Sequence, residues 1–208
     1  MSIMYHSDDI SVATLNRLPQ YLNYLKTLPA DYAPYISAPT IAKALNLGYV
    51  QVRKDLAFVT KSGKPKIGYD TKQLKKDLEE FLGYNDLDDV ILVGAGKLGS
   101  ALLESTGFAH YGLKIAYAFD VNDKCGLTLN GKPILHLDKL PEICGNLKPR
   151  IGIICVPKQF AQAVCDLMVE NGIKAIMNFA PVHLKAPADV LIQNENIAAS
   201  LALLSKKL

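Results

Sequence analysis

A glycine-rich turn constrains this chain more than any other feature. Residues Val90–Val93 form a short, wholly apolar run, which is typical of a strand buried on both faces of a parallel sheet. The segment Gly94-Ala95-Gly96-Lys97-Leu98-Gly99 follows directly and has the spacing G-x-G-x-x-G. Its glycines allow a tight turn, the approach of a pyrophosphate to the backbone, and close packing of the next helix. The pattern predicts a strand, a phosphate-binding turn and a helix in succession.

A second apolar run ends in an acidic residue, at the distance from the glycine turn that is typical of dinucleotide-binding folds. Lys114–Phe119 is followed by Asp120, about 20 positions after Gly99, where dinucleotide-binding folds place the carboxylate that binds the adenine ribose. A negative charge there repels a 2′-phosphate, so the sequence predicts NAD(H) rather than NADP(H). The alternative is a Rossmann-like domain that binds no nucleotide.

Two later strands are expected to contribute to the same site. Arg150–Val156 is followed by Pro157, and Gly172–Asn178 by Phe179-Ala180-Pro181. Ligands of parallel α/β sheets bind at the carboxyl ends of the strands. The predicted cofactor-binding residues are Gly94, Ala95, Gly96, Lys97, Leu98, Gly99, Asp120, Lys124, Val156, Pro157, Asn178, Ala180 and Pro181.

The N-terminal part has the pattern of a winged helix-turn-helix. Ser37 is a plausible N-cap for a helix that reaches Leu45, and a short turn containing Gly48 separates it from an amphipathic helix at Tyr49–Val59. Lys61–Tyr69 contains two glycines, a proline and three lysines, which predicts a basic hairpin. Further helices are expected at 14–28 and 71–82.

Positive charge is concentrated in the same region. Nine Lys and Arg against two Asp lie between Lys43 and Lys76, which suits a phosphate backbone, although a solvated basic face is the alternative. Arg and Gln pair with guanine and adenine edges, whereas Lys pairs with phosphates. The predicted contacts to double-stranded DNA are Ser37, Tyr49, Gln51, Arg53, Lys54, Lys64 and Lys66.

These patterns predict an α/β protein with three segments. A winged-helix domain is expected at 1–85, a Rossmann-type parallel-sheet domain at 86–192, and a C-terminal dimerisation helix at 193–208, which the family resemblance given below implies to be domain-swapped. The helix Ile197–Leu204 is apolar on nearly all sides, so we expect a second copy of the chain to cover it. With no apolar run of about 18–20 residues and no secretory signal pattern, we expect no membrane association and a cytoplasmic location.

The sequence offers little for catalysis or metal binding. The four cysteines lack metal-ligand spacing and are expected to be reduced thiols, and the four histidines have no suggestive context. A dehydrogenase would need a positioned acid or base and a substrate domain, which the chain does not offer after the cofactor domain. We therefore predict no enzyme, no catalytic residue and no metal site, with an NAD-dependent oxidoreductase and a CoA- or adenylate-binding module as alternatives.

Taken in order, these motifs resemble the Rex family of bacterial redox-sensing repressors. The resemblance covers nearly the whole chain and implies dimers in which a winged-helix domain is joined to a Rossmann domain, with exchanged terminal helices. It also implies operator binding in the free or NAD⁺ state and release as NADH accumulates. The motifs that carry it are Arg17-Leu18-Pro19-x-Tyr21, Gln51-Val52-Arg53-Lys54-Asp55-Leu56, Gly94-Ala95-Gly96-x-Leu98-Gly99 and Asn178-Phe179-Ala180-Pro181.

The chain departs from this family at three positions. Family members often have Arg, Tyr and Asp where this chain has Asn23, Ser105 and Asn196, and these residues meet near the nicotinamide. The resemblance therefore implies either a repressor modulated by the NADH/NAD⁺ ratio or a DNA-binding paralogue with a lost or altered NADH response. The tip of the predicted wing, Lys64-Pro65-Lys66, also replaces an Arg-Gly pair.

Overall fold

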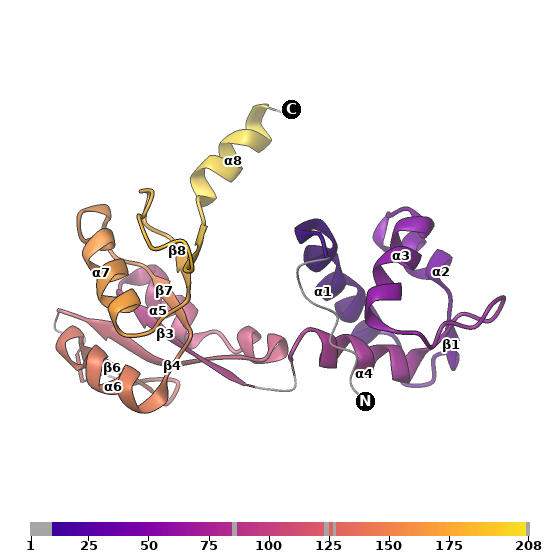
Figure 1. The fold of residues 1–208 in the computed structure, drawn as a ribbon, viewed down its shortest axis with the longest axis horizontal. Helices are drawn as coiled ribbons and strands as arrows, with labels where there is room; N and C mark the ends of the chain where they lie inside the picture. Colours follow the sequence, from indigo (N-terminus) through magenta and orange to yellow (C-terminus); the bar gives the residue numbers. More distant parts are fainter. Residues whose placement is uncertain (1–9, 85–86, 123–124, 127, 207–208) are drawn as a thin grey trace. The chain divides into compact units, whose positions relative to one another are not determined.

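The fold consists of two compact units (Figure 1), Met1–Asn85 and Asp86–Leu208. The computed structural model describes residues 10–84, 87–122, 125–126 and 128–206. The predicted residue Lys124 lies outside this part of the chain. Each unit has its own hydrophobic core, and each is described separately below.

Four helices and two short strands form the N-terminal unit. The helices are α1 (Val12–Thr27), α2 (Ala38–Leu45), α3 (Tyr49–Val59) and α4 (Thr71–Phe81), and strands β1 (Tyr35–Ile36) and β2 (Tyr69–Asp70) pair antiparallel. The periodic apolar residues of all four helices meet in one core, which includes Leu18, Leu22, Ile41, Leu56 and Leu74.

Local capping explains where these helices begin and end. Ser11 caps α1 and accepts a hydrogen bond from the amide of Thr14, so α1 begins before the predicted start and contains Pro19 in its interior. The predicted cap Ser37 accepts from the amide of Thr40, and Asn46 ends α2 in the left-handed conformation (φ 54°). Polar residues therefore mark both ends of α2, and the turn to α3 begins at Asn46.

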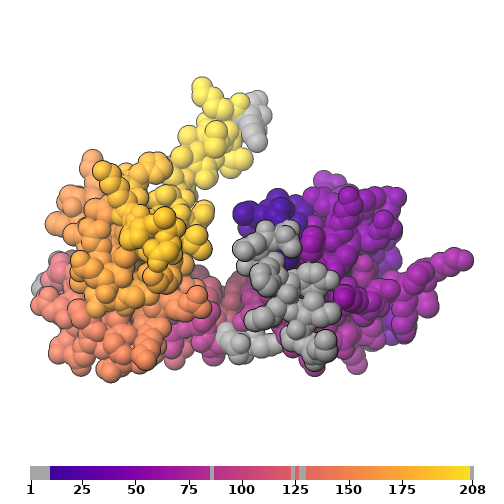
Figure 2. Space-filling view, viewed as in Figure 1, coloured from indigo at the N-terminus to yellow at the C-terminus, as the bar shows by residue number. Residues whose placement is uncertain are grey.

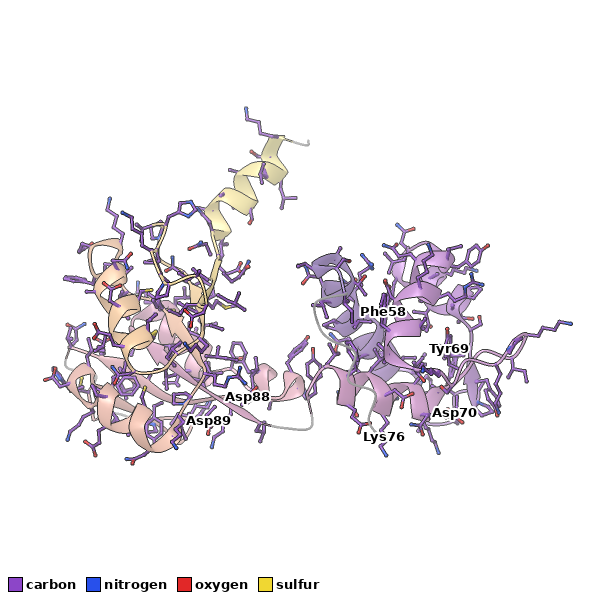
Figure 3. All side chains as sticks on the ribbon, viewed as in Figure 1. Phe58, Tyr69, Asp70, Lys76, Asp88 and Asp89 are labelled. Atoms are coloured by element: carbon purple, nitrogen blue, oxygen red, sulfur yellow. The ribbon has the colours of Figure 1, made fainter. Side chains whose placement is uncertain are left out.

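A basic hairpin follows α3 and projects from the N-terminal unit (Figure 2). Lys64 and Gly68 pair across it through their backbones, and we call the loop 60–68 the wing. A side chain at position 68 would bring its Cβ within 2.3 Å of the Ile36 carbonyl oxygen, and the residue has φ 102°, so only glycine fits at the base of the wing. Figure 3 shows Tyr69 and Asp70 where the wing returns to α4.

The C-terminal unit is built on a seven-stranded sheet. Its strands are β3 (Asp88–Val93), β4 (Leu113–Asp120), β5 (Thr128–Leu129), β6 (Lys132–His136), β7 (Ile151–Ile154), β8 (Ala175–Asn178) and β9 (Leu191–Asn194). The spatial order is β5-β6-β4-β3-β7-β8-β9, and every pair is parallel except β5 with β6. The six parallel strands have the order of a doubly wound dinucleotide-binding fold, which reverses direction between β3 and β7.

Helices pack on both faces of this sheet. They are α5 (Lys97–Glu104), α6 (Leu140–Leu147) and α7 (Lys158–Glu170). The unit also contains the C-terminal helix α8 (Ile197–Lys206) and two short 3-10 helices, η2 (Gly107–Tyr111) and η3 (Leu137–Lys139). Helices α6 and α7 contribute to the core on one face, and Leu103 of α5 to the core on the other. The two cores explain why β3 and β7 are apolar on both sides.

The glycine turn between β3 and α5 is closely packed. A Cβ at position 99 would lie 1.9 Å from the carbonyl oxygen of Gly94. Gly94 itself has φ 101°, and a Cβ there would lie 2.7 Å from the carbonyl carbon of Cys155 in the segment after β7. These two glycines are therefore required for packing, whereas a Cβ at Gly96 would meet nothing within 4 Å.

The C-terminal helix α8 has no buried residue in the single chain, and Ile197, Leu201, Leu203 and Leu204 each expose at least 60% of their surface. Figure 2 shows it, in yellow, standing clear of the sheet. Strand β9 extends to Asn194, so the predicted boundary between residues 192 and 193 falls within a strand. Among the described residues, no helix is both long and apolar enough to cross a bilayer.

Candidate nucleotide cavity and nucleic-acid interface

A cavity of about 730 Å³ opens at the carboxyl ends of the parallel strands. The strand register brings Val93, Phe119 and Ile154 side by side, so the residues that follow them converge on this cavity. Its volume is typical of small-molecule and cofactor sites. The lining residues are Val93, Gly94, Gly96, Asp120, Val121, Asn122, Leu137, Cys155, Val156, Pro157, Phe160 and Ala163.

Asp120 is the polar centre of the cavity, and its carboxylate is held by the protein. Its Oδ2 accepts a hydrogen bond from the amide of Ala95 (2.7 Å), which ties the glycine turn to the end of β4. Its Oδ1 accepts from the amides of Val121 and Asn122 and from Nδ2 of Asn122. Among the described residues, Oδ2 thus accepts a single hydrogen bond, from the glycine turn, whereas Oδ1 accepts three from the residues that follow β4.

The structure brings part of the predicted cofactor set together. Gly94, Gly96, Asp120, Val156 and Pro157 line the cavity. Seven other predicted residues do not line it: Ala95, Lys97, Leu98, Gly99, Asn178, Ala180 and Pro181. Of these, Ala95 bonds to Asp120, Lys97 begins α5, and Gly99 packs against Gly94.

Asn178 has a structural position at the end of β8. It is fully buried, and its Nδ2 donates to the carbonyls of Ala180 and Val182 and to Oδ1 of Asn194, while its Oδ1 accepts from the amide of Ala180. The side chain therefore shapes the loop that carries Ala180 and Pro181. The predicted cofactor contact at Asn178 would have to compete with these bonds.

The sequence reasoning missed the apolar half of the cavity. Val121 and Phe160 are large and exposed, and Leu137 and Ala163 complete the wall. The position of Asn122, two residues after the acidic strand end, was the available signal for its bond to Asp120. Cys155 also lines the cavity, and burial raises the pKa of its thiol to about 12.

A groove between the wing and α3 collects several predicted DNA contacts. Its lining includes Ser37, Arg53, Lys64 and Lys66, and it encloses about 550 Å³. Arg53 and the two lysines are exposed, whereas the hydroxyl of Ser37 is engaged in capping α2. The ammonium of Lys64 lies 5.6 Å from the centre of the Tyr35 ring, a cation–π contact that steadies the wing.

Tyr49, Gln51 and Lys54 complete the outward face of α3. All three are exposed. Gln51 and Lys54 border a second groove, together with Arg17 of α1. Every predicted DNA-binding residue except Ser37 thus has a side chain available to a partner on the surface of the N-terminal unit.

Asp55 fixes α3 to α1, a role that the sequence reasoning did not assign. The carboxylate is buried and accepts four hydrogen bonds. The donors are Nε and Nη2 of Arg17 (2.7 and 2.9 Å), the hydroxyl of Tyr21 (2.6 Å) and the hydroxyl of Thr14 (3.1 Å). The signal was present, because helical spacing places Asp55 beside the inward Val52 and Leu56.

These hydrogen bonds determine the ionisation of the network. Burial alone would raise the pKa of Asp55, but the bonds from Arg17, Tyr21 and Thr14 outweigh it and lower the pKa below its ordinary value. The hydrogen bond to Asp55 raises the pKa of Arg17, whereas burial is the main cause of the raised pKa of Tyr21. At neutral pH the site is a buried Asp–Arg ion pair with a neutral tyrosine.

Family models match both units. Residues 9–57 match a model described as a putative DNA-binding protein N-terminus, and residues 85–182 match one described as a CoA binding domain. The redox-sensing transcriptional repressor Rex of Bacteroides fragilis is 40% identical over 206 residues, which cover 98% of this chain and 94% of that protein. The chain belongs to the Rex family.

Other Rex proteins are similar over almost the same span. That of Pelotomaculum thermopropionicum is 40% identical over 93% of this chain and 91% of its own. Among solved structures, the Rex-family repressor RSP in complex with β-NAD⁺ and operator DNA has a TM-score of 0.88 at 34% identity, covering 95% of this chain and 92% of its own. RSP in complex with β-NADH has a TM-score of 0.83 at 33% identity.

Membership in the Rex family confirms the predicted α/β fold class with an N-terminal DNA-binding domain and a Rossmann-type sheet, whereas the domain swap of the terminal helix stays a prediction. The relatives are named as transcriptional repressors, which favours the predicted repressor over the oxidoreductase alternative. The three positions that the resemblance singled out lie on the surface or at helix ends. Asn23 is exposed on α1, the Ser105 hydroxyl accepts from the amide of Gly107, and Asn196 Oδ1 accepts from the amide of Ala199 at the start of α8.

We expect the substitution Asp55→Asn to destabilise the N-terminal unit and to change its pH dependence. The variant leaves the Arg17 guanidinium without its counter-charge, so the free energy of unfolding at pH 7 should fall by about 3–5 kcal/mol. Because the pKa of Asp55 is lowered on folding, its stabilisation is present above the ordinary value of 3.8 and is lost as the pH falls through the lower folded value. Urea unfolding at pH 7 and pH 3 measures both effects.

The matched control for this experiment is Asp31→Asn, since Asp31 is an exposed acid in the same unit. The control should unfold like the parent protein at both pH values. Equal stability of Asp55→Asn and the parent at pH 7 would contradict the structural role of the ion pair.

Proposed function

We propose that this protein is a homodimeric transcriptional repressor that binds operator DNA through its N-terminal unit and is regulated by NAD(H) in its C-terminal unit. The observation that carries the proposal is the pairing, in one chain, of a cationic helix and wing with a cavity built on a dinucleotide-binding turn. It is expected to act in the cytoplasm, and an adenylate-type ligand such as CoA is the competing occupant of the cavity.

The residues around the cavity fit an adenine dinucleotide. Gly96 leaves open space beside the backbone, and α5 begins there without a side-chain cap, so its first amides are available to a diphosphate. Asp120 Oδ2 accepts a single hydrogen bond from the described residues and lies at the cavity, which suits a ribose hydroxyl, and the negative charge of the carboxylate disfavours a 2′-phosphate. When bound, NAD(H) would supply the redox signal, while Asp120 and the glycine turn hold its adenosine diphosphate half.

The N-terminal unit fits double-stranded DNA. Arg53, Gln51 and Tyr49 lie on the exposed face of α3, which corresponds to the recognition helix of a helix-turn-helix. Lys54, Lys64 and Lys66 would contact phosphates at either side of that helix. The Asp55–Arg17 pair orients α3 without using any of these exposed groups.

A second copy of the chain is the expected partner of α8. Its exposed leucines and isoleucine cost free energy in water, and α8 buries no residue within its own chain. A groove of about 410 Å³ on strands β7, β8 and β9 is also apolar, with Ile151, Met177 and Leu191 in its lining. In a dimer, the two recognition helices must lie about 34 Å apart to enter successive major grooves.

Regulation then follows from a shift between two dimer states. A nucleotide that binds one of the two dimer states more tightly shifts the population toward that state and so changes the spacing of the recognition helices. A redox response arises only if NADH and NAD⁺ differ in how strongly they prefer that state. The neutral residues Asn23, Ser105 and Asn196 motivate the alternative, a DNA-binding paralogue with a lost or altered response.

Measurements of operator affinity at several NADH/NAD⁺ ratios test this regulation. We expect NADH to weaken binding to operator DNA about 5- to 150-fold relative to NAD⁺, the range of typical allosteric couplings. Fluorescence anisotropy of a labelled operator fragment gives the dissociation constant at each ratio. An affinity that is the same at all ratios would establish the paralogue instead.

The substitution Arg53→Ala tests the DNA interface. Removal of a guanidinium that reads a base should weaken operator binding about 5- to 150-fold, corresponding to about 1–3 kcal/mol. Lys76→Ala removes an equal charge and is the control, because Figure 3 shows Lys76 projecting from α4 on the side away from α3. Equal affinities of Arg53→Ala and the parent for the operator would refute the contact.

The double substitution Leu201→Glu with Leu204→Glu tests the dimer. Because α8 buries nothing in its own chain, the variant should fold but sediment as a monomer. Analytical ultracentrifugation distinguishes the two states, and Ser200→Glu on the same helix is the control for added charge. A variant that remains dimeric would show that α8 does not carry the interface.

A further inference from the structure

The cavity has an aromatic wall that the proposed contacts to ribose and diphosphate leave unused. Phe160, in the first turn of α7, exposes 56% of its surface and lines the cavity. Val121, directly after Asp120, exposes 64% and lines the same cavity. Both are large apolar side chains, and they are removed from water only when a ligand fills the space beside them.

The cavity spans the reversal in strand order between β3 and β7 but does not reach the end of β8. Its walls come from the segments after β3, β4 and β7, from η3 after β6, and from α7. The carboxyl end of β8 contributes no residue to it. A dinucleotide whose diphosphate sits at the glycine turn and whose ribose meets Asp120 therefore directs the purine into this cavity.

The side chains beyond Asp120 suit a flat aromatic base. Leu137 and Val121 are apolar, and Ala163, one turn after Phe160 on the same side of α7, is small enough to leave room beside the phenyl ring. Aromatic rings favour offset stacking on one another, and contacts between a base and an aromatic side chain contribute substantially to nucleotide binding.

We propose that Phe160 forms the adenine-binding wall of the cavity, stacking on the purine while Asp120 holds its ribose. This inference rests on the proposed function and adds a residue that decides affinity for the adenosine half without distinguishing NADH from NAD⁺. Ligands that carry the adenosine diphosphate group share this contact, whereas nicotinamide mononucleotide does not.

The substitution Phe160→Ala is the direct test. Loss of stacking should lower the affinity for NADH, NAD⁺ and ADP-ribose by the same factor, about tenfold. Titration calorimetry on the full-length protein measures each affinity. The ring is exposed, so thermal unfolding should change little. Gln159→Ala is the matched control, because Gln159 is exposed on the same turn and does not line the cavity.

A second variant reports the contact directly. The chain contains no tryptophan, so Phe160→Trp introduces a single indole whose emission reports stacking. We expect quenching by ADP-ribose and NAD⁺ and none by nicotinamide mononucleotide at the same concentration.

The possible failures are distinguishable. The adenine-stacking role of Phe160 would be refuted if Phe160→Ala bound ADP-ribose as tightly as the parent. It would also be refuted if the emission of Phe160→Trp responded only to nicotinamide mononucleotide. Either result would leave nucleotide binding itself intact. A parent protein that binds neither ADP-ribose nor NAD(H) would overturn the proposed function itself.

Discussion

The C-terminal unit depends on a backbone contact that exists because position 99 has no side chain. The first turn of α5 packs against the carbonyl of Gly94, where a Cβ would lie 1.9 Å away. This contact sets the direction of α5, and the amide of Ala95 within the same turn binds Asp120 at the end of the neighbouring strand. The turn, the helix and the acidic strand end are thus one connected unit, and the cavity is the space they leave.

The N-terminal half has a different organising element, an ion pair. Asp55 accepts hydrogen bonds from three side chains of α1, and these bonds hold α3 in place from its buried face. A buried ion pair gives little net stability but accepts only one geometry, which suits a helix whose exposed residues must match base edges. The motifs around Arg17 and Asp55 that carry the resemblance to Rex proteins therefore include residues of structural as well as binding importance.

Several levels of this structure were predictable from the sequence. Apolar runs and capping residues such as Ser37 identified most helices and strands, and the G-x-G-x-x-G spacing located the turn. The sequence reasoning failed where a side chain's partner is distant along the chain. Nothing local indicates that Asn178 bonds to Asn194, or that Phe160 lines the same space as Val121, since these pairs meet only through the strand order. Local patterns identify elements, whereas the walls of a site depend on tertiary packing.

Cys155 has a consequence for how such a cavity senses its ligand. Burial raises the pKa of its thiol and so disfavours the thiolate, the form that reacts with peroxides and disulfides. The sulfur that lines the cavity is therefore less reactive toward oxidants than an ionised cysteine would be. A response that begins at this cavity would then depend on exchange of its ligand rather than on chemistry at this sulfur.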